Sequence, residues 1–308
     1  MPASLSTPFD NAHRTMQNDC PELLIPVVND TFDKHYTQEE TIVHENDIHF
    51  SRQPYATPQK TITDNHFMIL GKDTLEQFHL EMQSTEDKTI SVRMFDYDTQ
   101  IAKEHCQLSA DFLEITLPYS AVIQLRSNKN TPNYIKTLFK TPQGTITYEI
   151  PIIKISNYSI DSIFEKKLFF YIPFHIFVYE NHFMEYNRDE EKLFYLQKIY
   201  EDIRKRLESA CIQGVISEYC FGTIIDMSKL VLEHIAANYE NIKKGLLNVM
   251  GGEIIDYPTK IACRKAWQAG LQEGRQEGFI YLIKDGLLSI SEAAKRLEMS
   301  EADLQKLL

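Results

Sequence analysis

The sequence predicts a mixed α/β protein in which an N-terminal region rich in strands is followed by a helical C-terminal region. Between residues 61 and 179, apolar residues alternate or form the short runs typical of strands. After Tyr179 they recur at helical spacing instead. The 308 residues are 43% hydrophobic and 25% charged, close to the globular average, so most of the chain is expected to fold.

The N-terminal region is predicted to begin with a flexible tail over residues 1–20. This segment is rich in Ser, Pro, Asn and Asp, and it lacks the basic start and the apolar run of a signal peptide. A helix is predicted over 22–32, because the apolar residues there share one face. Residues 35–60 are polar and are assigned mostly to loop, with a short strand at 41–43.

A β-hairpin is predicted next, from strands over 61–70 and 75–83 that a short glycine-containing turn connects. Successive side chains of a strand point to opposite faces. The second strand therefore places apolar residues on one face and three polar residues, His79, Glu81 and Gln83, on the other.

The segments after the hairpin alternate between predicted helices and strands. A helix is predicted over 89–104, because its apolar residues recur at helical spacing. The strongest apolar run, 168–179, is too short to cross a bilayer and is predicted to be a buried strand. Further strands are predicted over 112–117, 121–125 and 145–155, and further helices over 189–211 and 218–249.

The C-terminal segment is predicted to contain a glycine-spaced helix and then a helix–turn–helix. Three glycines between 270 and 278 recur every four residues, on one side of a helix. In the last segment Ser291 is predicted to cap the first helix, while Leu304 and Leu307 anchor the second. The second helix is acidic where a DNA-reading helix would meet phosphate, which favours a structural role or protein contact, including self-association, over DNA reading.

Domain organisation and compartment follow from these patterns. We predict a tail over 1–20, an α/β domain over 21–180, a helical region over 181–263 and the C-terminal segment over 264–308. The five cysteines are scattered and form no Cys-x-x-Cys pair, so neither a disulfide framework nor a zinc site is predicted. With no membrane span predicted, a reducing cytoplasm is the expected compartment.

The net charge restricts the partners of the chain. Its formal value is −12, from 32 Lys+Arg and 44 Asp+Glu, and an acidic protein repels polyanions at long range. Binding to DNA would therefore require a local basic surface or a bound cation, and no block of Lys and Arg stands out in the sequence.

The hairpin carries the residues that are best suited to chemistry. Asp64 on the first strand, with Glu81 and the Met82 carbonyl on the second, would supply the hard oxygen ligands that Mg²⁺ prefers. Gln83 would orient a water molecule or contact a phosphate. On spacing alone two interpretations stay open, namely a metal site and the exposed polar face of a half-solvated hairpin.

Between Leu24 and Lys103 the chain resembles the nuclease region of the recombination-promoting (Rpn), PD-(D/E)XK transposase family. The resemblance rests on the segments LIPVVNDTF, ETIVHENDIHF, KTITDNHFMIL, QFHLEMQS and SVRMFDYDTQIA. It implies a restriction-endonuclease-like three-layer α/β core with a mixed sheet over 21–180. It also implies DNA cleavage that depends on Mg²⁺, with Mn²⁺ as a substitute.

The resemblance also implies roles for individual residues. Asp64 and Glu81 would be metal ligands together with the Met82 carbonyl, and Gln83 stands where the wider superfamily commonly has a lysine. Glu45 is either a further carboxylate or a solvated side chain. Arg93 is expected to brace Glu81 rather than to meet a DNA phosphate.

Two functions are therefore expected. The first is a magnesium-dependent DNA endonuclease that uses Asp64, Glu81 and Gln83. The alternative is a non-catalytic assembly or regulatory protein that keeps the nuclease fold and acts, as a possible homo-oligomer, through its C-terminal helices.

Overall fold

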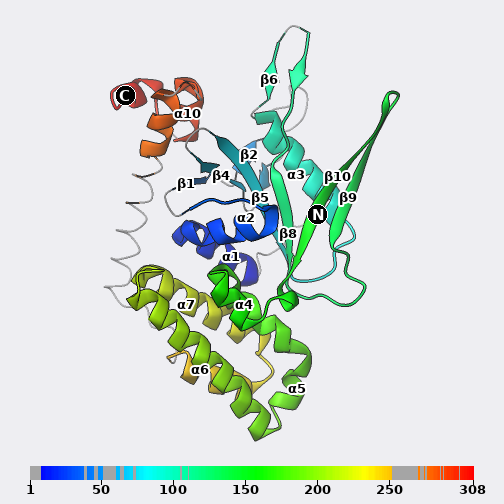
Figure 1. The fold of residues 1–308 in the computed structure, drawn as a ribbon, viewed down its shortest axis with the longest axis vertical. Helices are drawn as coiled ribbons and strands as arrows, with labels where there is room; N and C mark the ends of the chain where they lie inside the picture. The colour runs from blue at the N-terminus through cyan, green and yellow to red at the C-terminus, as the bar shows by residue number, and fades with distance from the viewer. Residues whose placement is uncertain are drawn as a thin grey trace. The chain divides into compact units, whose positions relative to one another are not determined.

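The computed structural model shows a mixed α/β protein (Figure 1). It describes residues 8–37, 40–44, 48–50, 60–62, 66–71, 74–104, 106–109, 111–251, 270, 274, 276–284, 286, 288–297 and 299–308. The chain divides into two compact units, one of Met1–His35, Met82–Lys88 and Ala121–Cys263, the other of Tyr36–Glu81, Thr89–Ser120 and Arg264–Leu308. Each unit is built from three separate ranges of the chain.

The strands form a mixed sheet whose order is β1-β4-β5-β8-β10, with β9 added along β10. Neighbours β1, β4 and β5 pair antiparallel, whereas β8 and β10 pair parallel. The bounds are β1 Thr41–His44, β4 His66–Leu70, β5 Leu75–Gln83, β8 Tyr119–Gln124, β9 Tyr134–Thr141 and β10 Gly144–Lys154. Strand β5 is therefore an interior strand of the sheet.

Four of the predicted elements in this region are confirmed with small shifts at their ends. They are the strands β1, β5, β8 and β10. The predicted strand over 61–70 is divided between β3 Lys60–Ile62, which pairs with β2 Ile48–Phe50, and β4. The predicted strand over 112–117 is reduced to the short β7 Leu113–Glu114, which pairs with β6 Gln107–Leu108.

The prediction of a flexible tail is wrong for residues 8–19, which form helix α1 Pro8–Asp19. Its residues Phe9, Ala12 and Met16 are buried and lie on one helical face. The Phe9 ring packs edge-on against Phe177 and His234, with centroid separations of 5.0 and 4.9 Å. The face was hidden in the sequence because three polar residues, His13, Gln17 and Asp19, are buried beside the apolar ones.

The apolar run predicted as a buried strand is buried, but it is the 3₁₀ helix η3 Phe169–His182. A continuous apolar run has no periodicity that separates a buried strand from a buried helix. Pro173 lies inside the run, and proline cannot donate to a strand ladder. Proline is therefore an argument against an interior strand at this run.

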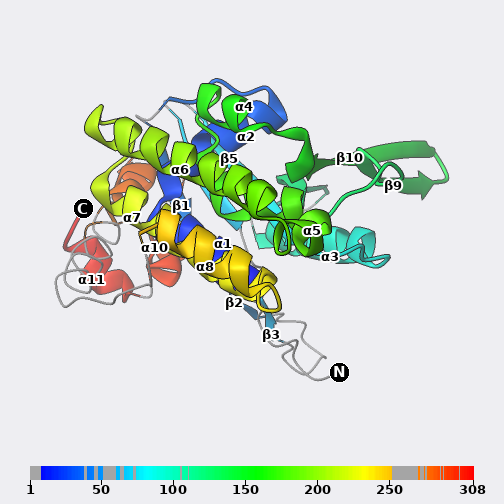
Figure 2. The ribbon, with the colours of Figure 1, turned by 90° about the horizontal axis from the view of Figure 1, so that it is seen from below.

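The remaining elements of the first unit are helical. The helix predicted over 22–32 is present as η1 Pro21–Leu23 and α2 Leu24–Phe32. The helix predicted over 218–249 is two helices, because Asn187 caps a second one by accepting hydrogen bonds from the backbone N–H groups of Asn241 and Ile242. Figure 2 shows these two helices, α7 Glu218–Ile235 and α8 Glu240–Val249, together with α6 Glu190–Ile212. Two shorter helices of this unit are α4 Ile160–Glu165 and α5 Phe183–Tyr186.

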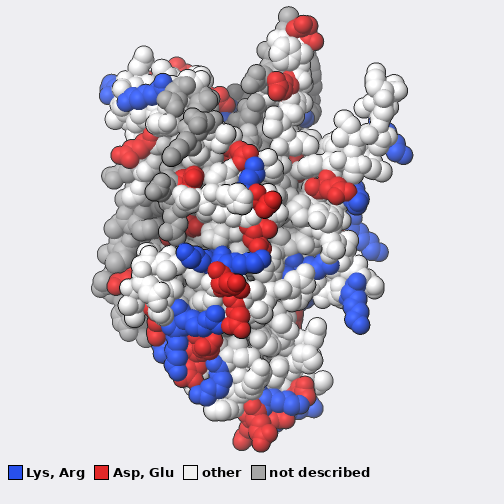
Figure 3. Space-filling view, viewed as in Figure 1, with Lys and Arg blue, Asp and Glu red and all other residues white. Residues whose placement is uncertain are grey.

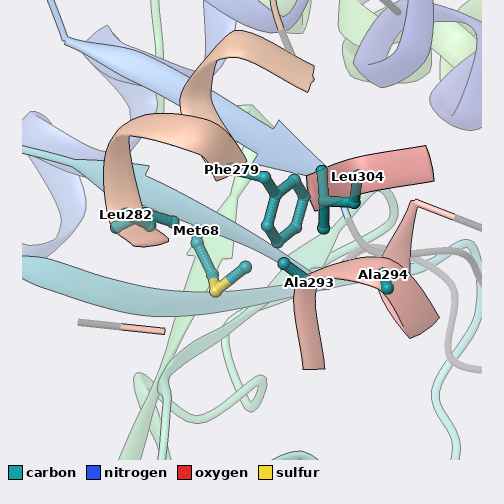
Figure 4. Packing of buried hydrophobic residues seen from close by; sticks show 6 residues of the cluster. All are labelled: Met68, Phe279, Leu282, Ala293, Ala294 and Leu304. Carbon is teal, nitrogen blue, oxygen red and sulfur yellow. The ribbon is translucent and has the colours of Figure 1, made fainter. Parts of the chain in front are cut away.

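In the second unit the C-terminal helices pack on the sheet. Helices α10 Ile290–Arg296 and α11 Glu301–Gln305 contribute Ala293, Ala294 and Leu304 to a buried cluster. Figure 4 shows these side chains around Phe279, with Met68 of β4 and Leu282 completing the group. The helix–turn–helix pattern therefore forms part of a core.

Two details of the predicted helix–turn–helix are wrong. The cap of α10 is Ser289, whose side chain accepts a hydrogen bond from Glu292 N, instead of Ser291. Leu304 is fully buried, as an anchor must be, but Leu307 is 46% exposed. The second helix ends at Gln305, two residues before Leu307.

No helix within the described ranges has the length and apolar character needed to cross a membrane.

His175 in η3 gives a pH-dependent contribution to stability. Burial lowers its pKa to about 4 from the ordinary value of 6.5, although Nε2 donates to the Tyr158 carbonyl oxygen at 3.1 Å. A histidine with a lowered folded pKa stabilises the protein above its unfolded pKa, and this contribution is lost as pH falls from 6.5 towards 4. We expect the loss to reach about 3 kcal/mol in denaturant titrations.

The matched variants are His175→Gln and His182→Gln, which change a buried and an exposed histidine of the same 3₁₀ helix. The first should flatten the dependence of the unfolding free energy on pH, and the second should leave it as in the wild type. Equal slopes for all three proteins would contradict the assignment.

Candidate functional site

The candidate site begins with polar residues on an interior strand. Residues 78–82 of β5 are all buried, including His79 and Glu81. A polar group inside a protein is costly unless it is hydrogen-bonded. The polar face predicted for β5 is therefore covered rather than half solvated, and its side chains need partners.

Helix α3 Ile90–Glu104 supplies those partners. Its buried side chains are Met94, Asp98, Ile101 and Ala102, which recur at the spacing of one helical face. Asp98 is fully buried within this otherwise apolar stripe. A buried carboxylate in such a position requires compensating donors.

Asp98 is the centre of a chain of three buried side chains. His79 Nδ1 lies 2.7 Å from Asp98 Oδ1, and both side chains are fully buried. Ser120 of β8 donates its hydroxyl proton to the same oxygen at 2.7 Å. An ionised carboxylate only accepts hydrogen bonds, so His79 Nδ1 is the donor when Asp98 is charged.

This hydrogen bond fixes the histidine ring. The ring also packs edge-on against Tyr97, with a centroid separation of 5.8 Å. Across the strand pair, His79 lies opposite His66 of β4, whose side chain is also buried. His79 Nε2 is buried without a hydrogen-bond partner within the described part of the chain.

Glu81 lies one step further along the same face of β5 and pairs with the same helix. Arg93 Nη2 donates to Glu81 Oε1 at 2.9 Å, and the two side chains are 32% and 11% exposed. This confirms that Arg93 braces Glu81. A metal-binding carboxylate needs a fixed position close to the surface, and the ion pair with Arg93 fixes Glu81 in this way.

The other predicted site residues are placed less directly. Gln83, at the end of β5, donates its side-chain amide to the Met82 carbonyl oxygen at 2.9 Å. The carbonyl proposed as a metal ligand therefore already accepts one hydrogen bond, and a carbonyl oxygen has two lone pairs. Asp64 and Glu45 lie outside the described residues.

The described residues do not by themselves form the predicted metal site. Among them, no group of three or more His, Cys, Asp or Glu side chains is arranged to hold a metal ion. Glu81 and the Met82 carbonyl provide hard oxygen donors, the type that Mg²⁺ prefers. Asp64 would have to complete this set.

Asp98 and Ser120 were not predicted from the sequence as site residues. A signal for Asp98 was present, because it lies four residues after Met94 and three before Ile101, inside the face predicted to be apolar. An acid in that stripe, opposite a strand that carries a histidine, indicates a buried pair. For Ser120 the sequence holds no comparable signal, since its role depends on how β8 meets α3.

Comparisons of the chain with protein-family models, with curated proteins and with solved structures found no match. The resemblance to the Rpn nuclease family therefore stays a prediction.

Proposed function

We propose that this chain is a magnesium-dependent DNA endonuclease of the PD-(D/E)XK, Rpn transposase-associated type, with a restriction-endonuclease-like core. The observation that carries the proposal is Glu81, a nearly buried carboxylate on an interior strand that Arg93 holds in place at 2.9 Å. Beside it, Asp98 fixes the ring of His79 on the same strand face. Such a braced acid on a rigid strand suits metal-assisted hydrolysis of a phosphodiester.

In this proposal the chain's own residues bind and orient. Asp64, Glu81 and the Met82 carbonyl would hold the cation, and Gln83 would orient a water molecule or the scissile phosphate. When bound, Mg²⁺ supplies Lewis-acid activation of water and neutralises charge on the phosphate. Arg93 is a positioning residue, because it acts through Glu81.

Glu81→Gln is expected to abolish nicking of supercoiled plasmid in Mg²⁺ or Mn²⁺, by at least about a hundredfold. The amide keeps an oxygen that can accept from Arg93 but loses the charge that a hard cation needs. The matched control is Glu76→Gln, which makes the same change nearer the start of β5, where Glu76 accepts from the Tyr36 hydroxyl. We expect the control to nick like the wild type, and Asp64→Ala to behave like Glu81→Gln.

The alternative is a non-catalytic assembly or regulatory protein. The observation that favours it is the Glu81–Arg93 ion pair, because such a pair can serve only to hold α3 against β5. Under that alternative, purified wild-type protein would not nick DNA in either cation at low salt. Glu81→Gln would then change only the unfolding midpoint. Wild-type nicking that survives in Glu81→Gln would also end the nuclease proposal.

A further inference from the structure

The β9–β10 hairpin is a basic element in an acidic protein. Residues 128–154 contain four lysines and one acidic residue, a net of +3 in a chain whose formal net charge is −12. Figure 3 shows Lys side chains along the hairpin on the right of the molecule. The four lysines are Lys129, Lys136, Lys140 and Lys154, and the acid is Glu149.

The register of the hairpin separates its two faces. Lys136 lies opposite Glu149, and Lys140 lies opposite Thr145. Because directly opposed residues of an antiparallel pair point to the same face, the two lysines share a face with Leu138 between them and with three β10 side chains, Thr145, Thr147 and Glu149. We call this the lysine face. The opposite face is largely apolar and carries Ile135, Phe139, Ile146, Tyr148 and Ile150.

Two of the four lysines are engaged within the hairpin region. Lys154 donates to the Thr131 carbonyl oxygen at 2.5 Å and so holds the loop before β9. Lys136 pairs with Glu149 at 2.6 Å, but both side chains are exposed, and exposed pairs exchange easily with solvent or a ligand. Lys129 and Lys140 are exposed and form no ion pair within the described part of the chain.

We propose that the lysine face, together with Lys129 of the loop before β9, binds the phosphate backbone of double-stranded DNA. This inference rests on the proposed nuclease function, and it identifies the surface that would bind the DNA substrate. A two-stranded β-ribbon fits the major groove, and Lys and Thr side chains are common phosphate contacts. An acidic chain must confine such contacts to a local basic element, because its remaining surface repels the polyanion.

A second copy of the chain is a weaker candidate for this element. Strand β9 is the edge of the sheet, and lysines on an edge strand disfavour pairing with another strand. The feature that a second copy would use is Ile146, which is 68% exposed on the apolar face. Self-association through Ile146 is therefore an outcome that the test must separate from DNA binding.

The test measures the affinity for a fluorescent duplex by anisotropy, without divalent cations, so that no cleavage is required. The double variant Lys129→Gln/Lys140→Gln is compared with Lys205→Gln/Lys244→Gln, an equal charge change at exposed positions of α6 and α8. In about 50 mM salt we expect the hairpin variant to bind about tenfold more weakly or worse, and the control to match the wild type. The dependence of log affinity on log salt concentration should become shallower by about 0.9 for each phosphate that the variant no longer neutralises.

Three results would overturn the inference. They are a wild-type protein that does not bind the duplex, equal weakening by both double variants, and an Ile146→Asn variant that lowers the solution mass while the lysine variants leave DNA affinity unchanged. Failure here is distinguishable from failure of the nuclease proposal. If the hairpin variant binds DNA normally while Glu81→Gln abolishes nicking, the proposed DNA-binding surface is wrong and the nuclease proposal is kept. If the hairpin variant loses DNA binding while Glu81→Gln nicks normally, the nuclease proposal is wrong and the DNA-binding surface is kept.

Discussion

Replacing Asp98 with alanine is expected to lower the free energy of unfolding by about 3–5 kcal/mol. Removal of one partner leaves the fully buried His79 and the Ser120 hydroxyl without the oxygen that both contact at 2.7 Å. Replacing Ser120 with alanine should cost less, about 1 kcal/mol, because it removes only a hydrogen bond from a neutral donor. Both changes in the free energy of unfolding are measured from the denaturant midpoints, with the slope of that free energy against denaturant concentration unchanged.

The matched control for this prediction is Asp96→Ala. Asp96 lies on the same helix, two residues before Asp98, and is exposed. We expect its unfolding free energy to stay within about 0.5 kcal/mol of the wild type. A variant Asp98→Ala that unfolds at the wild-type midpoint would show that the buried chain of side chains does not stabilise the fold.

The sequence was sufficient to predict elements that have a clear local period. The spacing of Ile90, Met94 and Ile101 predicted α3, and the alternation along residues 75–83 predicted β5. The contact between Arg93 and Glu81 was instead predicted from the resemblance to the Rpn family, and the structure shows it at 2.9 Å. Local patterns thus predicted the two elements that carry this ion pair but not the ion pair itself.

Patterns without a period gave wrong predictions. The run 169–177 is apolar at nearly every position, so its burial was predictable while its 3₁₀ conformation was not. Strand β9 was not predicted, although Tyr134, Ile135, Thr137 and Phe139 favour strands, because its two lysines and its short apolar content leave no clear alternation. The same residues explain why no basic surface was predicted: Lys129, Lys136 and Lys140 are spaced four to seven residues apart and form no block, and Lys136 and Lys140 share a face only because β9 is a strand.

The C-terminal segment contributes side chains to a buried cluster of the second unit. Self-association through these helices is still a prediction, but their buried apolar side chains already pack against other residues of the same chain. The cluster around Phe279 includes Met68 of β4 together with residues of α10 and α11. A segment that completes a core cannot be removed without exposing that core.

Leu304→Ala is therefore expected to lower the free energy of unfolding by about 2–5 kcal/mol, because it opens a cavity beside Phe279. Leu307→Ala makes the same change three residues later at a side chain that is 46% exposed, and it should cost less than about 1 kcal/mol. Self-association through the exposed end predicts a different result for Leu307: Leu307→Ala would lower the solution mass by light scattering, although it changes the unfolding midpoint little. Because the two leucines differ in burial and not in chemistry, this comparison decides whether the C-terminal helices serve the core of this chain or the surface of an assembly.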